Sequence, residues 1–91
     1  MNWTIKYTPT AAKAIRKLDS GTQSKVYAAL EMIRENPDRG KPLQLTLKGL
    51  RSWRTSDWRI IYKTFENYLE ILIVAVGHRR EIYDRLKERL K

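Results

Sequence analysis

The sequence predicts a single α+β domain, in which an N-terminal strand and a helical hairpin pack on a small, mainly antiparallel sheet and a helix closes the chain. Two observations predict this arrangement. The first half contains two stretches with the apolar spacing of amphipathic helices, near residues 9–18 and 20–36. The second half is rich in alternating and β-branched segments, with an apolar run at 69–76. Because 91 residues suffice for one modest core and not for two, residues 1–91 are expected to form one domain.

The composition excludes several kinds of site. The chain has no cysteine and one histidine, His78, so disulfides, thiolate metal sites and histidine-based metal centres are not expected, and no cofactor is indicated. No apolar run approaches the roughly 20 residues of a membrane helix, and the N-terminus lacks the layout of a signal peptide. A cytoplasmic protein without a membrane partner is therefore expected. Nineteen Lys and Arg against ten Asp and Glu give a net charge of +9, which favours a polyanionic partner such as nucleic acid, or else an acidic protein.

A strand and a short helix are expected at the N-terminus. Apolar side chains alternate with polar ones at Trp3, Ile5 and Tyr7, which predicts a strand with one buried face, ending at Thr8. Thr8 then suits the N-cap of a helix, and Pro9 its first position, where the missing N–H costs nothing. This helix is expected over about residues 9–18, with Ala11, Ile15 and Leu18 on its apolar face.

A second helix is expected after a short break. Ser20 and Gln23 have the spacing of a capping box, and Asn36 before Pro37 should end the helix because a residue before proline avoids the helical region. Its apolar stripe is expected to contain Val26, Leu30 and Ile33, widened by Tyr27 and Ala29. Two helices joined by so short a turn should form an antiparallel hairpin.

The second half should supply most of the sheet. Leu43, Leu45 and Leu47 alternate with polar residues, which predicts an extended segment. The turn-forming residues at 55–57 predict a tight hairpin leading into a strand. On that strand one face should carry Trp58, Ile60 and Tyr62, and the other face Arg59, Ile61 and Lys63.

The apolar run at 69–76 is expected to be a central strand covered on both faces and stopped by Gly77, where the backbone can turn sharply. His78 then has a structural place at the strand end. The chain should close with a helix over residues 80–90, whose buried stripe is Ile82, Leu86 and Leu90.

Three segments resemble, in order and spacing, the RelE/ParE toxin superfamily: Leu47–Leu50 (LKGL), Trp58–Tyr62 (WRIIY) and Val76–Tyr83 (VGHRREIY). The resemblance covers nearly the whole chain and implies the same order of elements. It implies the toxin half of a type II toxin–antitoxin system, neutralised by a RelB-like antitoxin. RelE-like members cleave messenger RNA in the ribosomal A site without a metal, whereas ParE-like members poison DNA gyrase. The segments are more similar to the RelE side, which implies the ribosome and messenger RNA as partners, with no cofactor and no small-molecule substrate.

The resemblance also implies the site residues. It matches Arg59 to the family's strand arginine, Arg79 to its post-strand arginine and Tyr83 to its C-terminal helix tyrosine. Arginine suits such chemistry because its planar fork donates two parallel hydrogen bonds to phosphate and stays charged. Tyr83 is expected either to act as a base, to stack on a nucleobase, or to pack in the core beside Ile82.

Further phosphate contacts are expected from Lys48, Arg51, Arg54 and Arg80. The segment between Trp53 and Arg59 is about two residues shorter than in many relatives, so which of the first three contacts phosphate stays open. Two other functions also stay open, namely a ParE-like gyrase inhibitor without nuclease activity and a degenerate, non-toxic binding module.

Overall fold

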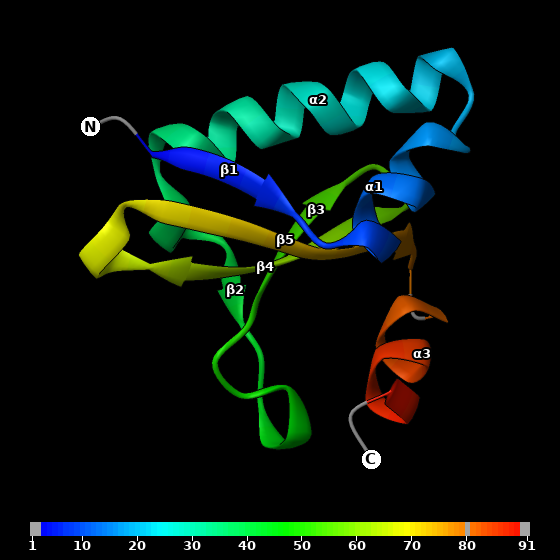
Figure 1. Ribbon diagram of the computed structural model, residues 1–91. Helices are drawn as coiled ribbons and strands as arrows, with labels where there is room; N and C mark the ends of the chain where they lie inside the picture. Colours follow the sequence, from blue (N-terminus) through cyan, green and yellow to red (C-terminus); the bar gives the residue numbers. More distant parts are fainter. Residues whose placement is uncertain (1–2, 80, 90–91) are drawn as a thin grey trace.

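A five-stranded mixed sheet forms the centre of the protein, in a computed structural model that describes residues 3–79 and 81–89 (Figure 1). The strand order is β1-β5-β4-β3-β2, with β1 parallel to β5 and every other pairing antiparallel. The strands are β1 (Thr4–Tyr7), β2 (Lys41–Pro42), β3 (Arg51–Thr55), β4 (Trp58–Phe65) and β5 (Glu70–His78). This is the predicted α+β architecture with a mainly antiparallel sheet.

Helices cover both faces of the sheet. They are α1 (Pro9–Arg16), α2 (Ser20–Glu35) and α3 (Glu81–Arg89), with short 3₁₀ turns η1 (Pro37–Arg39), η2 (Leu45–Leu47) and η3 (Glu66–Tyr68). In Figure 1, α2 lies above the strands and α3 lies below them. Within the described ranges no helix combines the length and apolar content that a membrane crossing requires.

Two separate apolar cores result. The larger joins α1 and α2 to one sheet face, and its buried members include Val26, Leu30, Ile33, Ile60 and Tyr62. The smaller lies under α3 and η2 on the opposite face, and its buried members are Leu47, Ile61, Ala75, Ile82 and Leu86. The predicted division of β4, with Ile60 and Tyr62 on one side and Ile61 on the other, is therefore confirmed.

Of the two predictions for the helix N-termini, one is confirmed and one is wrong. Thr8 caps α1, since its Oγ1 accepts from the Ala11 N–H at 3.1 Å, and it also donates to the Val74 carbonyl at 3.0 Å. The cap of α2 is Asp19 rather than Ser20: its carboxylate accepts from the Thr22 N–H. Gln23 instead donates to the Ile15 carbonyl at 2.9 Å and so ties the start of α2 to α1. The Asp19 carboxylate caps the free Thr22 N–H, and the Gln23 N–H that a Ser20 cap would bind donates to the Asp19 backbone carbonyl at 2.8 Å.

Strand β5 does not stop at Gly77 as predicted but continues to His78. Gly77 is needed for space, because a Cβ there would lie 2.6 Å from Ile82 Cδ1 on α3. The sharp turn comes at Arg79, whose φ of 38° is left-handed. A bulge in β5, where Ile61 pairs with Ala75 and Tyr62 with Ile73, resets the alternation of inward and outward side chains.

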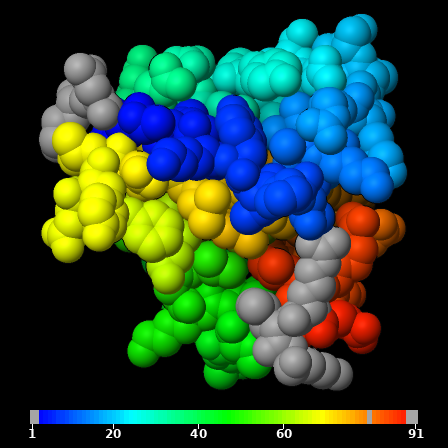
Figure 2. Space-filling view, in the orientation of Figure 1, coloured from blue at the N-terminus to red at the C-terminus, as the bar shows by residue number. Residues whose placement is uncertain are grey.

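Two other details differ from the predictions. Tyr27 does not widen the α2 stripe, since it is 50% exposed. The leucine segment is not extended throughout, because η2 turns it and leaves Leu45 86% exposed while burying Leu47. The chain between β2 and β3 therefore projects from the sheet (Figure 1) and forms a protrusion on the surface (Figure 2). Arg80 and Leu90 lie outside the described residues.

Candidate functional site

Two arginines face each other across the β3–β4 hairpin. Arg54 and Arg59 are directly opposed in the antiparallel register, next to the two-residue turn at Ser56 and Asp57. Opposed like charges destabilise a strand pair unless an anion lies between them. Arg59 Nη1 donates to the carbonyls of Ser56 (3.3 Å) and Trp58 (3.0 Å), and neither arginine forms an ion pair with a described carboxylate. The hairpin therefore presents two cations that form no ion pair within the described part of the chain.

Arg79 is held beside the same hairpin by Asp57. Its Nε and Nη2 both lie 2.9 Å from Asp57 Oδ1, and its backbone N–H donates to the Asp57 carbonyl at 2.7 Å. The hydrogen bond from Arg79 and its charge hold the pKa of the Asp57 carboxyl below its usual value. The side chains are 61% and 51% exposed, and such surface ion pairs contribute little stability. The Arg79 guanidinium is thus oriented by the Asp57 carboxylate.

These residues line a cleft with two adjoining halves, which we call the basic cleft. One half, about 550 Å³, is bounded by six residues: Arg54, Asp57, Arg59, His78, Arg79 and Glu81. The other half, about 320 Å³, is bounded by five: Lys41, Ser52, Arg54, Arg59 and Tyr83. Arg54 and Arg59 belong to both halves, so the cleft is continuous at the hairpin. Four cations and two carboxylates line it, which favours an anionic ligand.

Tyr83 packs against the smaller core and also lines the basic cleft. Its ring lies against the smaller core, and its hydroxyl is 2.7 Å from the Oγ of the buried Ser52. This bond joins α3 to β3 and fixes the tyrosine ring at the cleft wall. His78 packs against Trp58 in an edge-to-face contact, with the ring centroids 5.4 Å apart.

The predicted site residues divide into two groups. Arg54, Arg59, Arg79 and Tyr83 line the basic cleft. Lys48 follows η2 and lines neither half, and Arg51 donates to the carbonyls of Asp38 (2.9 Å) and Gly40 (2.8 Å) instead. Arg80 lies outside the described residues.

Five residues of the cleft were not predicted as site residues: Lys41, Ser52, Asp57, His78 and Glu81. Lys41 gave no sequence signal, because the two-residue strand β2 has no periodicity to detect. Asp57 was interpreted as a turn former and as an ion-pair partner for Arg59, whereas the structure pairs it with Arg79. Ser52 carried a detectable signal, since it is two residues before Arg54 and must share its face of β3.

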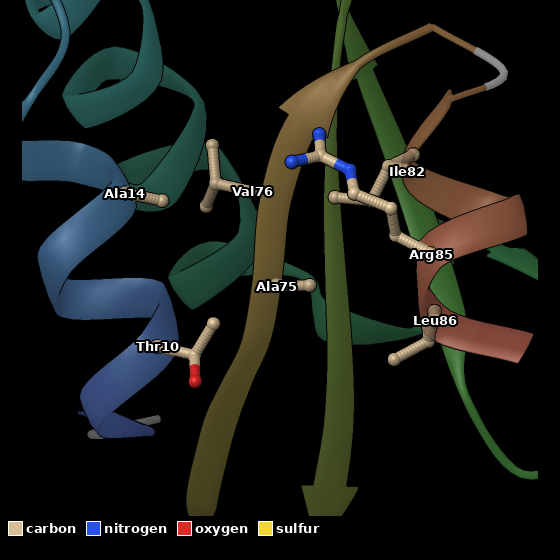
Figure 3. Close-up of a pocket in the computed structure, with 7 residues that line it drawn as sticks. All are labelled: Thr10, Ala14, Ala75, Val76, Ile82, Arg85 and Leu86. Carbon is tan, nitrogen blue, oxygen red and sulfur yellow. The ribbon is translucent and has the colours of Figure 1, made fainter. Parts of the chain in front are cut away.

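A separate hollow lies between α1 and α3 and is shown in Figure 3. Its volume is about 60 Å³, and its lining is mostly apolar, with Ala75 and Leu86 among the residues. Arg85 extends from α3 toward β5 at its edge. This hollow is too small for a nucleotide, so the basic cleft is the better candidate.

The lining of the basic cleft, with three arginines, a lysine and a tyrosine, suits a phosphate ligand. Charge-assisted bonds from a planar arginine fork are among the strongest available to a phosphate. Within the described part of the chain, no group of three or more His, Asp or Glu residues is placed to hold a metal ion.

Comparisons with known proteins agree on one group. The family described as "ParE toxin of type II toxin-antitoxin system, parDE" matches residues 5–83. Toxin RelG of Mycobacterium tuberculosis is 32% identical over 87 residues, covering 93% of this chain and all of that protein. Toxin RelE of the same organism is 30% identical over 84 residues, covering 87% of this chain and 84% of that protein.

Solved structures share the fold. The toxin–antitoxin complex RelBE2 of Mycobacterium tuberculosis contains a chain that superposes with a TM-score of 0.80 at 30% identity, covering 87% of this chain and 93% of that one. The isolated Escherichia coli RelE toxin superposes with a TM-score of 0.75 at 18% identity, covering 98% and 99%.

Proposed function

This chain belongs to the RelE/ParE superfamily of toxins from type II toxin–antitoxin systems, and we propose that it is a ribosome-dependent, metal-independent endoribonuclease that cleaves messenger RNA in the A site. The observation that carries the proposal is the place of Arg59 in the basic cleft, where it lines one half together with Arg79 and the other half together with Tyr83. The similarity to toxins named RelG and RelE favours the RelE-like activity. Inhibition of translation follows from loss of the message.

The proposed reaction uses the RNA's own 2′-OH as nucleophile. The 2′-oxygen forms a bond to the adjacent phosphorus, the bond to the 5′-oxygen breaks, the 2′-OH proton is lost to a base, and the leaving 5′-oxygen takes up a proton. Arg59 and Arg79 stabilise the negative charge that builds on the phosphoryl oxygens, which is often the largest catalytic term. Tyr83 supplies a ring and a hydroxyl next to the reacting phosphate.

The ribosome supplies the remaining geometry in this proposal. Holding the reacting atoms in line can remove roughly 7–11 kcal/mol of barrier, so a site with few catalytic groups suffices once the message is fixed. In the free protein Asp57 occupies the Arg79 fork, and the phosphate exchanges with it on binding.

A RelB-like antitoxin is the proposed protein partner. The RelBE2 complex shows that a related toxin is bound by an antitoxin. Because four cations and two carboxylates line the basic cleft, we propose that an acidic or amphipathic antitoxin segment covers Arg59 or displaces α3. Protection mapping of the complex tests this mechanism, and finding both regions equally accessible with and without antitoxin would refute it.

A translating extract tests the activity. Purified protein is expected to produce cuts within codons of translated messages, mapped by primer extension, and Arg59→Ala should abolish most of them. The matched family is that of ParE toxins, so gyrase inhibition is the second candidate. Intact messages together with trapped gyrase–DNA complexes would favour gyrase. Unimpaired growth on induction without antitoxin would contradict both activities and indicate a non-toxic binding module.

A further inference from the structure

We propose that Lys41, on the edge strand β2, contacts an RNA phosphate next to the one held by Arg54 and Arg59, which makes β2 part of the RNA site. This inference rests on the proposed function, because it assigns a second phosphate of the same RNA to the same cleft. Its ligand is the phosphodiester backbone of a single strand, recognised by charge rather than by sequence.

The cations of the basic cleft form a row across the sheet. Arg79 follows β5, Arg59 lies on β4, Arg54 on β3 and Lys41 on β2, so four successive strands contribute one cation each. Neighbouring strands lie about 4.8 Å apart. Lys41 is level with Ser52, two residues along β3 from Arg54, so the row crosses the strands diagonally and its backbone positions span more than roughly 14 Å. A row of this length is longer than one phosphate needs. It suits a backbone that crosses the strands and presents phosphates in succession.

The two halves of the cleft differ in their counter-ions. Asp57 and Glu81 line the half with Arg79. The half with Lys41 is lined by three cations, a serine and a tyrosine, without a carboxylate. Lys41 is exposed and forms no ion pair with the described carboxylates. This half therefore carries the stronger unneutralised positive charge, although it lies away from Arg79.

The chain holds the backbone of Lys41 in place. The buried Tyr62 hydroxyl accepts from the Gly40 N–H at 3.0 Å and donates to the Pro37 carbonyl at 2.6 Å. Arg51 donates to the Gly40 carbonyl at 2.8 Å, so both polar groups of the residue before Lys41 are fixed. Arg51, predicted to contact phosphate, thus has a positioning role through this turn.

Lys41 also lies next to the tyrosine of the site. It pairs directly with Ser52 across β2 and β3, and Ser52 is the hydrogen-bond partner of the Tyr83 hydroxyl. Lys41, Ser52 and Tyr83 therefore share one wall of the cleft. A phosphate bound there would lie between the Lys41 ammonium on one side and Arg54 and Arg59 on the other.

The experiment measures the affinity of the full chain for ribosomes programmed with a message whose A-site codon carries 2′-O-methyl groups, which block cleavage. Binding is measured at several salt concentrations for the parent protein, Lys41→Ala, Lys41→Arg and Lys25→Ala. Lys25 is an exposed lysine on α2 and serves as the charge-matched control. Losing one contact to a single-stranded phosphate should reduce the slope of log affinity against log salt by about 0.7.

We expect Lys41→Ala to reduce the slope by about 0.7 and to bind several-fold more weakly at moderate salt. Lys41→Arg and Lys25→Ala should keep the parental slope. If Lys41→Ala binds like Lys25→Ala while the parent protein still binds and cuts unblocked message, the Lys41 contact is wrong and the proposed function stands. If the parent protein itself fails to bind programmed ribosomes, the proposed function fails and the Lys41 contact fails with it.

Discussion

Arg59 and Arg79 are held in different ways in the free protein. Among the described residues, Arg59 donates to carbonyls of its own hairpin. Arg79 instead donates from Nε to the carboxylate of Asp57 and forms an ion pair with it through Nη2. Binding phosphate at Arg59 therefore requires no ion pair to break. Binding at Arg79 requires exchange of one anion for another, at an exposed pair where that exchange costs little.

Replacing either arginine with alanine should reduce cleavage far more than stability. Loss of one preorganised donor to a developing oxyanion typically lowers the rate ~10²–10³-fold. A surface substitution usually changes the free energy of unfolding by no more than about 0.5 kcal/mol. Arg79→Lys and Arg59→Lys should recover only part of the rate, because an ammonium cannot reproduce the two-pronged contact. Cleavage assays on folded variants test this, and a parental rate in Arg79→Ala would remove Arg79 from the site.

The Asp57 carboxyl should titrate below the ordinary value of 3.8, because Arg79 bonds to its ionised form. The pKa of this carboxyl is lower in the folded state than in the unfolded state. The ion pair therefore stabilises the folded protein at pH values above the unfolded-state pKa, and this stabilisation is lost as the pH falls through the folded-state pKa. Carbon-13 NMR of the carboxyl group should show the pKa rising toward 3.8 in Arg79→Ala. Lys25→Ala is the control and should leave it unchanged. Equal Asp57 pKa values in the parent protein and in Arg79→Ala would contradict the pairing.

The elements that local signals specify were predictable. Thr8 before Pro9, Asn36 before Pro37 and the turn at 55–57 each determine backbone geometry through their own chemistry, and the structure places boundaries at all three. The errors concern residues whose state depends on distant partners. The need for glycine at position 77 comes from Ile82 on the facing helix, and η2 depends on how Leu47 reaches the smaller core.

The predictions for the site show the same division between local sequence signals and contacts with distant residues. The family resemblance indicated Arg59, Arg79 and Tyr83, and all three line the basic cleft. It left the choice between Arg51 and Arg54 open, although these residues are three apart on β3 and therefore lie on opposite faces of the sheet. The structure adds that Arg51 donates to the carbonyls of Asp38 and Gly40. Lys41 was unpredictable because its place depends on pairing with Ser52, eleven residues later in the chain.

Thr8 joins the start of α1 to the sheet, so Thr8→Ala should cost more than an ordinary cap. The variant loses the bond from Ala11 N–H and also leaves the Val74 carbonyl without its hydroxyl donor. We expect a loss of about 1–2 kcal/mol in the free energy of unfolding, measured by urea denaturation. Thr10→Ala, an exposed threonine in the same helix, is the control and should change stability by less than about 0.5 kcal/mol. Equal effects of the two substitutions would contradict the role given to Thr8.

The two cores give the molecule an uneven distribution of stability. The larger core joins α1 and α2 to the sheet through eleven buried residues, whereas the smaller one has five. Among the described residues of α3, Ile82 and Leu86 belong to the buried set. An element with few buried apolar contacts opens locally at a free energy lower than the free energy of unfolding of the whole protein. Opening of α3 would also break the Tyr83–Ser52 bond, so the cleft depends on the less stable part of the molecule.

Leu86→Ala should therefore act mainly on α3, whereas Leu30→Ala in the larger core should destabilise the whole protein. Truncation of a buried leucine typically costs about 2–5 kcal/mol, and both side chains are almost fully buried. Hydrogen exchange should show faster exchange of α3 amides in Leu86→Ala, with α2 amides much less affected, and faster exchange of both helices in Leu30→Ala. Cleavage by Leu86→Ala should fall because Tyr83 leaves the cleft wall. Uniform acceleration of α2 and α3 amides in Leu86→Ala would show that α3 does not open separately from the larger core.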